Sequence, residues 1–87
     1  MHEPIVLPAL DASFAAWLAT QPELECHIRQ DLQMIWQYWR GRSHPEFVDG
    51  RDAAQRVRGV AERAGFVELA SLYCLLYEGF CLRLITL

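Results

Sequence analysis

The sequence predicts an all-α protein, a compact four-helix domain with one short helix and three longer ones. No segment shows the apolar–polar alternation of a half-buried strand, whereas apolar residues recur at helical spacing along most of the chain. Proline and glycine residues separate these segments, as they commonly do at helix ends. Of the 87 residues, 53% are hydrophobic and 22% are charged, so we expect one globular domain over residues 1–87.

The first helix is expected to follow an extended N-terminal arm, residues 1–10, which contains Pro4 and Pro8. Asp11 is placed to cap a short helix that runs to about Ala19, because a carboxylate can accept hydrogen bonds from the first free backbone N–H groups. The inner face of this helix would hold Phe14, Trp17 and Leu18.

The second helix is expected from Pro22 to Arg40. Pro22 suits the first turn, where its missing N–H leaves no hydrogen bond unmade. Gly41 is expected to end the helix in the left-handed conformation. The core stripe of this helix would consist of Leu24, Ile28, Leu32, Ile35 and Trp39.

A loop is expected over residues 41–50, between the second and third helices. Pro45 disfavours a helical backbone at His44, so the chain should not return to a helix at once. Phe47 and Val48 would anchor this loop on the core, because a long loop in a small domain needs such a contact.

The third and fourth helices are expected over residues 52–64 and 67–84, with Asp49 as the cap of the third and Gly65 between them. Gly79, inside the fourth helix, is expected to allow close packing. The inner face of the third helix would hold Ala53, Val57, Val60, Ala61 and Ala64. The inner face of the fourth would hold Leu69, Leu72, Tyr73, Leu76, Phe80 and Leu84.

The second helix has a wider apolar arc than one neighbouring helix covers, because Trp36 extends the core stripe on one side and Met34 on the other. Either this helix is central in the bundle, or one of its flanks is an interface. Aromatic and arginine side chains commonly anchor binding sites, although buried Trp is also frequent in small cores. The candidate partner-binding residues are Trp36, Tyr38, Trp39, Arg40 and Arg42, with Leu75 and Leu82 on the fourth helix.

Asp31 falls within this apolar arc, where an unpaired carboxylate would be strongly destabilising. Arg56 and Arg63 flank the inner face of the third helix, so we expect a structural ion pair between Asp31 and one of these arginines. The alternative is that Asp31 and the neighbouring Glu25 receive a basic group from a binding partner.

We expect neither an enzyme nor a cofactor or metal site. Cys26 and His27 are adjacent, but adjacent side chains on a helix point about 100° apart and cannot be assumed to form a nucleophile–base pair. The histidines and cysteines match no zinc-ligand spacing, and the chain has neither GxGxxG nor a P-loop.

A cytoplasmic location is expected from three features. The three cysteines are an odd number without a CxxC pair, which is typical of reduced thiols. The N-terminal residues lack the basic segment of a secretory signal. Glu78 and Arg83 interrupt the apolar stretch over residues 69–87, so we expect no membrane span.

Nucleic acid is not an expected partner. Eight basic residues, all arginine, stand against eleven acidic ones, and the formal net charge of −3 has the wrong sign for neutralising phosphates. An acidic balance instead suits a basic protein partner.

A pattern over about residues 51–82 consists of Gly59-Val60, Ala64-Gly65-Phe66, Leu72-Tyr73, Leu76 and Gly79-Phe80. This pattern resembles that of small helical proteins encoded beside type VI secretion spike and effector genes. The resemblance implies a bacterial cytoplasmic protein that handles a secreted toxin, either as an adaptor (chaperone) or as an immunity protein. It implies no catalytic residues.

The expected function is therefore that of a non-enzymatic protein-interaction module that binds a cognate secreted effector or toxin. One alternative is a homodimer with no other partner. Another is a small helical homodimer that acts as a DNA-binding or regulatory protein, in which the third helix would meet DNA through Arg51, Arg56, Arg58 and Arg63.

Overall fold

The computed structural model describes residues 12–86, which form four helices: α1 (Ala12–Leu18), α2 (Pro22–Trp39), α3 (His44–Arg63) and α4 (Val67–Thr86). These residues contain no strand, so the predicted all-α class is confirmed. The expected arm over residues 1–10 and the Asp11 cap lie outside the described residues.

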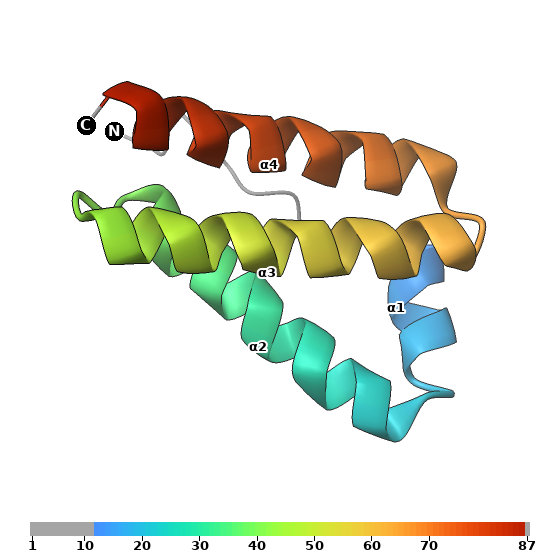
Figure 1. The fold of residues 1–87 in the computed structure, drawn as a ribbon. Coiled ribbons are helices and arrows are strands. Elements are labelled where there is room, and N and C mark those ends of the chain that lie inside the picture. Colours follow the sequence, from blue (N-terminus) through green and yellow to red (C-terminus); the bar gives the residue numbers. More distant parts are fainter. Residues whose placement is uncertain (1–11, 87) are drawn as a thin grey trace, which may run out of the picture.

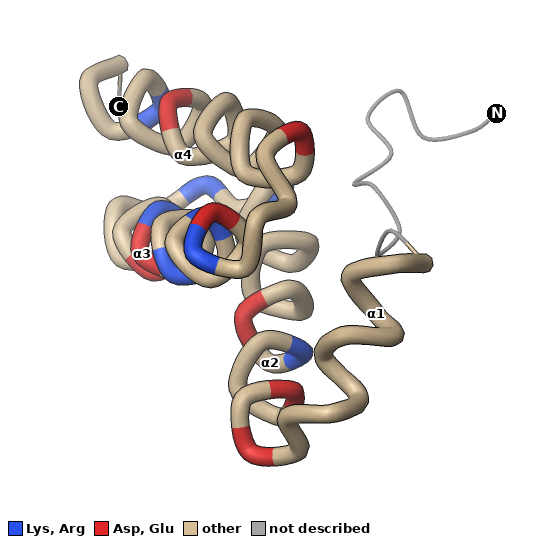
Figure 2. The backbone as a smooth tube through the Cα atoms, turned by 90° about the vertical axis from the view of Figure 1, so that its right-hand side faces the viewer, with Lys and Arg blue, Asp and Glu red and all other residues tan. Residues whose placement is uncertain are grey.

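The central helix is α3, which lies between α4 and α2 and packs along both (Figure 1). α4 returns antiparallel to α3, while α2 diverges from α3 toward its own N-terminus. α1 lies to one side of the other helices, near the start of α2 (Figure 2). The wide apolar arc of α2 suggested that α2 could be the central helix of the bundle. In the structure the central helix is α3.

α1 is held in place by aromatic side chains. Phe14 and Leu18 are fully buried, and the ring of Phe14 meets the ring of Phe66 edge-on, with 5.1 Å between centroids. Trp17 is partly buried and lies 6.2 Å from Phe66. Because Phe66 directly precedes α4, these contacts hold α1 against the start of α4.

The expected loop over residues 41–50 is wrong, because α3 already begins at His44. Ser43 and Glu46 form a capping box: the Ser43 hydroxyl accepts a hydrogen bond from the Glu46 N–H, and Glu46 Oε1 accepts one from the Ser43 N–H at 3.0 Å. These two bonds satisfy N–H groups that a helix start leaves free. Pro45 lies in the first turn, where a proline is tolerated.

The earlier start makes α3 a helix of 20 residues and changes the role of two predicted positions. Asp49 lies inside α3 and does not cap it. Phe47, expected to anchor a loop, is a buried core residue of α3 with 5% exposure.

Gly41 and Gly65 were both expected at helix ends, but only Gly65 adopts the left-handed conformation in the described residues. Gly65 ends α3 with φ of 90° and is the sole residue of the 12–86 segment with positive φ. The prediction of a left-handed Gly41 is therefore wrong. A side chain at Gly41 would instead meet Glu46, since a Cβ there would lie 2.8 Å from Glu46 Oε1. Gly41 thus leaves room for the capping carboxylate.

We predict that Ser43→Ala lowers the free energy of unfolding by about 1 kcal/mol, because the start of α3 loses a cap. Urea unfolding followed by circular dichroism measures this change. Ser71→Ala is the matched control, since Ser71 is exposed inside α4 and caps nothing in the described structure. Equal effects of the two substitutions would contradict the role of the cap.

The same cap predicts a dependence on pH. Hydrogen bonds from the Arg42 backbone, then from the side chain and backbone of Ser43, hold the pKa of Glu46 below its ordinary value of 4.5. The stabilisation is therefore complete above that ordinary value and is lost as pH falls through the lower folded-state pKa. Glu46→Gln should remove this part of the acid dependence.

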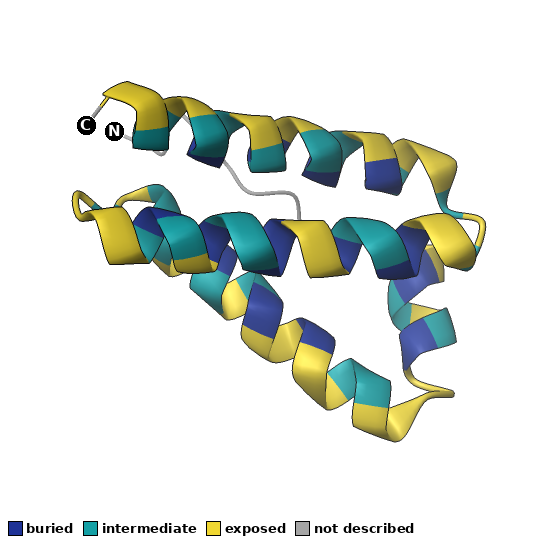
Figure 3. Ribbon diagram, viewed as in Figure 1, coloured by how far each residue is buried: buried dark blue, intermediate teal, exposed yellow. Residues whose placement is uncertain are grey.

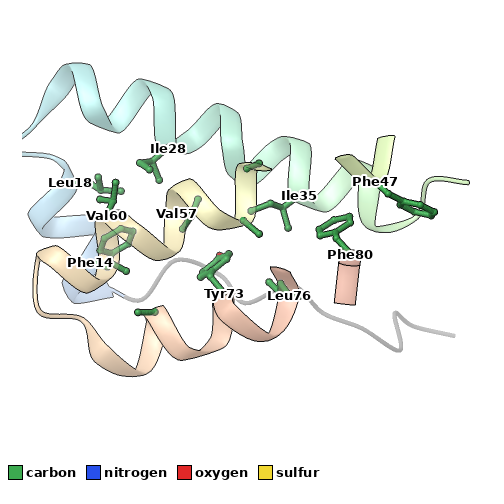
Figure 4. Close-up of a cluster of buried hydrophobic side chains, with 14 residues drawn as sticks. Phe14, Leu18, Ile28, Ile35, Phe47, Val57, Val60, Tyr73, Leu76 and Phe80 are labelled. Carbon is green, nitrogen blue, oxygen red and sulfur yellow. The ribbon is translucent and has the colours of Figure 1, made fainter. Parts of the chain in front are cut away.

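Small residues let α3 approach both neighbours closely. Its buried positions include Gly50, Ala53, Ala54 and Ala61 (Figure 3). A Cβ added at Gly50 would overlap the ring of Phe80 from α4. The largest fully buried side chains of the described residues are Phe14, Leu18, Ile28, Ile35, Val57, Tyr73 and Phe80 (Figure 4).

Candidate functional site

The most unusual surface of the described structure is the side of α4 that faces away from α3. Of the five exposed large hydrophobic residues among residues 12–86, four lie on α4: Val67, Leu75, Leu82 and Ile85. The core uses only Ala70, Tyr73, Leu76 and Phe80 as buried residues of this helix. Figure 3 shows the resulting exposed strip along α4.

We define the outer face of α4 as Ser71, Leu75, Glu78, Leu82 and Ile85. All five residues are exposed, with 63% exposure for Leu75, 62% for Leu82 and 78% for Ile85. Because these positions follow one another at alternating distances of four and three residues, they lie along one side of the helix. Leu75 and Leu82 are thus exposed where the sequence placed them.

The predicted residues at the end of α2 divide into exposed and inward ones. Trp36 is 39% exposed, and the guanidinium of Arg40 lies 4.5 Å from its ring centroid. Arg42 is exposed, while Tyr38 is partly buried against the core. Trp36 with Arg40 is therefore a second, smaller aromatic surface, on α2.

Trp39 is partly buried against the core, as its place in the predicted core stripe requires, and its role as a partner contact stays a prediction. The Trp39 ring meets the Phe80 ring edge-on, with 5.2 Å between the ring centroids. The guanidinium of Arg83, on α4, lies 3.8 Å from the centroid of the Trp39 ring. A Cβ at Gly79 would lie 2.7 Å from this indole, so the glycine makes room for it, in line with the close packing expected there. The indole Nε1 is buried without a hydrogen-bond partner.

Asp31 pairs with Arg56 through both carboxylate oxygens. Arg56 Nη2 donates to Oδ1 at 2.8 Å, and Nε donates to Oδ2 at 3.1 Å. Asp31 is 5% exposed, and the hydrogen bond to it is the main cause that raises the pKa of Arg56. The ion pair is structural, because it satisfies a carboxylate inside the bundle.

Arg63 does not pair with Asp31 in the described structure. It lies seven residues beyond Arg56, about 10 Å further along α3, and its side chain runs back toward Gly59. The alternative role of Asp31 as a receiver of a partner's basic group is also not supported, since Asp31 is occupied. Glu25, the other carboxylate of that alternative, pairs with Arg29 at 3.0 Å.

A groove of about 560 Å³ lies between α2 and α3. Leu24, Ile28 and Val60 contribute apolar walls, and the Asp31–Arg56 pair lies at its edge. His27 also lines the groove, together with Arg58 and Glu62.

The exposed Cys26 thiol accepts a hydrogen bond from the Gln30 amide at 3.9 Å. Within residues 12–86, no group of three or more His, Cys, Asp or Glu side chains is arranged to hold a metal ion.

Three of the four arginines of α3 pair with carboxylates. Arg51 pairs with Asp52 at 3.1 Å and Arg58 with Glu62 at 3.3 Å, in addition to the Arg56 pair. Figure 2 shows acidic and basic positions mixed along this helix. The arrangement does not favour contact between α3 and DNA phosphates.

α4 is long and apolar enough to cross a membrane, judged by length and composition only. The core helices of water-soluble proteins pass the same test. The apolar residues of α4 fall into two groups. One group packs on α3, and the other lies on the outer face of the helix.

Comparison of the chain with protein-family models, curated proteins and solved structures finds no match. The resemblance to type VI secretion proteins therefore stays a prediction.

Proposed function

We propose that this protein is a non-enzymatic interaction module that binds another protein through the outer face of α4. The supporting observation is that Leu75, Leu82 and Ile85 are each more than 60% exposed along one side of a well-packed helix. Exposed apolar patches rimmed by polar residues mark protein interaction sites. Burial of a leucine side chain against a partner gains roughly 1.5–3 kcal/mol.

The class of partner that we propose is a secreted effector or toxin, following the resemblance over residues 51–82. The chain would act in the cytoplasm, either as an adaptor that holds the effector before export or as an immunity protein that blocks it. Both roles need a stable binding surface, and the outer face of α4 is the surface that we propose for it.

Site-specific photo-crosslinking tests this proposal. The photoreactive residue benzoylphenylalanine replaces Leu82 in one variant and Gln33 in a matched control, because Gln33 is exposed on α2, away from the outer face of α4. Each variant is expressed from the natural locus of the gene and irradiated in living cells. We expect a discrete adduct with a different protein from the Leu82 variant and none from the control.

A second variant at Leu75 should give the same adduct, because it lies on the same side of α4 as Leu82. Adducts of equal yield from the Gln33 position, or no adduct from either α4 position, would contradict the proposed function. Mass spectrometry of the adduct identifies the partner and shows whether it is a toxin or effector.

A further inference from the structure

The outer face of α4 has the spacing of a helix-pairing seam. Its positions, Ser71, Leu75, Glu78, Leu82 and Ile85, alternate at distances of four and three residues, as the contact positions of paired helices do. α4 is one unbroken helix of 20 residues over this stretch. A second helix can therefore lie along it and contact each position in turn.

Glu78 is the central residue of this seam and carries its one charge. It is exposed and takes part in no ion pair of the described structure. Its nearest polar contact is the Cys74 thiol, at 3.9 Å from Oε2. A helix that covers the seam brings this carboxylate into an apolar interface, where it needs a cation.

The protein does not supply that cation from α4 itself. Arg83 is the only basic residue of α4, and its guanidinium is stacked 3.8 Å from the Trp39 ring centroid on the inner side. Its Nη1 also donates to the Gly79 carbonyl at 3.3 Å. The partner must therefore bring the positive charge.

A second copy of this chain does not meet that need. In an antiparallel pair of α4 helices, Leu75 would face Leu82 of the other copy, but Glu78 would face Glu78. A parallel pair would also bring the two Glu78 carboxylates together. Because like charges across an interface are unfavourable, Glu78 acts against self-association.

A membrane surface is also a poor fit. Helices that lie on membranes usually carry Lys or Arg on their polar flanks, which are attracted to anionic lipids. The exposed ionisable residues of α4 are instead Glu68 and Glu78.

We infer that the outer face of α4 binds an amphipathic helix of the partner protein, with apolar residues along its contact seam and a Lys or Arg opposite Glu78. The inference rests on the proposed function and names the chemistry of the partner. Leu75, Leu82 and Ile85 provide the apolar contact, and Glu78 selects the charge.

The Glu78→Arg variant of the same chain serves as the probe, because its α4 carries an apolar seam with a central cation. Wild type and variant are measured separately and as an equimolar mixture by light scattering after size-exclusion chromatography, over a concentration series. We expect the mixed pair to associate at least about tenfold more tightly than either protein with itself. Circular dichroism checks that the variant keeps the helical content of the wild type.

Glu68→Arg is the matched control, because it makes the same charge change on the same helix but outside the seam. Its mixture with wild type should associate no more tightly than wild type alone. Equal association of wild type with itself and with Glu78→Arg would overturn the inference, as would a mixture that stays monomeric throughout the series. Binding of wild type to phosphatidylglycerol vesicles, lost in Leu75→Ser/Leu82→Ser, would also overturn it.

These outcomes are separate from the test of the proposed function. One combined outcome is a crosslinked partner on α4 and no association between wild type and Glu78→Arg. That outcome would support the protein-binding role and reject the partner helix with a cation opposite Glu78. Absence of a crosslinked partner would reject the role itself.

Discussion

Replacement of Phe80 by alanine is expected to lower the free energy of unfolding by about 3–5 kcal/mol. Phe80 is fully buried where three helices meet: its ring contacts Trp39 of α2 at 5.2 Å and Phe47 of α3 at 6.4 Å between centroids. Its removal leaves a cavity that Gly50, directly beneath the ring, cannot fill. Urea unfolding monitored by circular dichroism and tryptophan fluorescence measures the loss.

A double-mutant cycle with Gly50 controls this prediction. Gly50→Ala alone should cost roughly 1–3 kcal/mol, because the new Cβ overlaps a ring that is fully buried. In the Phe80→Ala background the same substitution should cost nothing or stabilise, since alanine favours a helix over glycine. Should Phe80→Ala be too unstable to measure, Phe80→Leu gives a smaller cavity for the same cycle. An equal cost of Gly50→Ala in both backgrounds would contradict the packing.

Arg56→Met is expected to destabilise the protein by about 3 kcal/mol, and Asp31→Leu by clearly less. The reason is the unequal burial of the pair: the Asp31 side chain is 8% exposed and that of Arg56 is 53% exposed. Loss of Arg56 leaves a buried carboxylate without its partner. Loss of Asp31 leaves a guanidinium that water can solvate. Thermal and urea unfolding of the two variants measure the difference.

Arg58→Met is the matched control for this pair. Its ion pair with Glu62 is at the surface, with the Glu62 side chain 63% exposed, so its loss should cost no more than about 1 kcal/mol. A larger effect of Asp31→Leu than of Arg56→Met would show that the buried carboxylate does not dominate the energetics of the pair.

The helices of the fold follow from patterns that a sequence displays directly. Apolar periodicity predicted α2 and α4, and Gly65 predicted the end of α3, since only glycine readily adopts its φ of 90°. The start of α3 differs from the prediction because Pro45 lies in the first turn of the helix and does not break it. Ser43 and Glu46 have the spacing of a capping box, and Pro45 is compatible with the first turn that they define.

The site could be predicted only in part, because exposure depends on how helices pack. Leu75 and Leu82 were predicted from their place opposite the core stripe of α4. Ile85 and the central Glu78 were missed, although their spacing from Leu75 and Leu82 carries the signal. The inward position of Trp39 depends on Gly79 of another helix, which the pattern of α2 does not display.

The arginine that pairs with Asp31 could not be chosen from the sequence either. Arg56 and Arg63 lie on similar sides of α3, two turns apart, so the choice depends on the register between α2 and α3. Ile28 and Ile35 of α2 belong to the same buried cluster as Ala53, Ala54 and Ala61 of α3, and the packing of this cluster sets the register.

The mass of the isolated wild-type chain in solution tests most directly whether the outer face of α4 is reserved for a different protein. Light scattering after size-exclusion chromatography, over a concentration series, measures it. We predict a monomer of 10.0 kDa, because Glu78 disfavours the pairing of two copies. A dimer that persists on dilution and is lost in Leu75→Ser/Leu82→Ser would contradict this account, because a second copy would then occupy the surface.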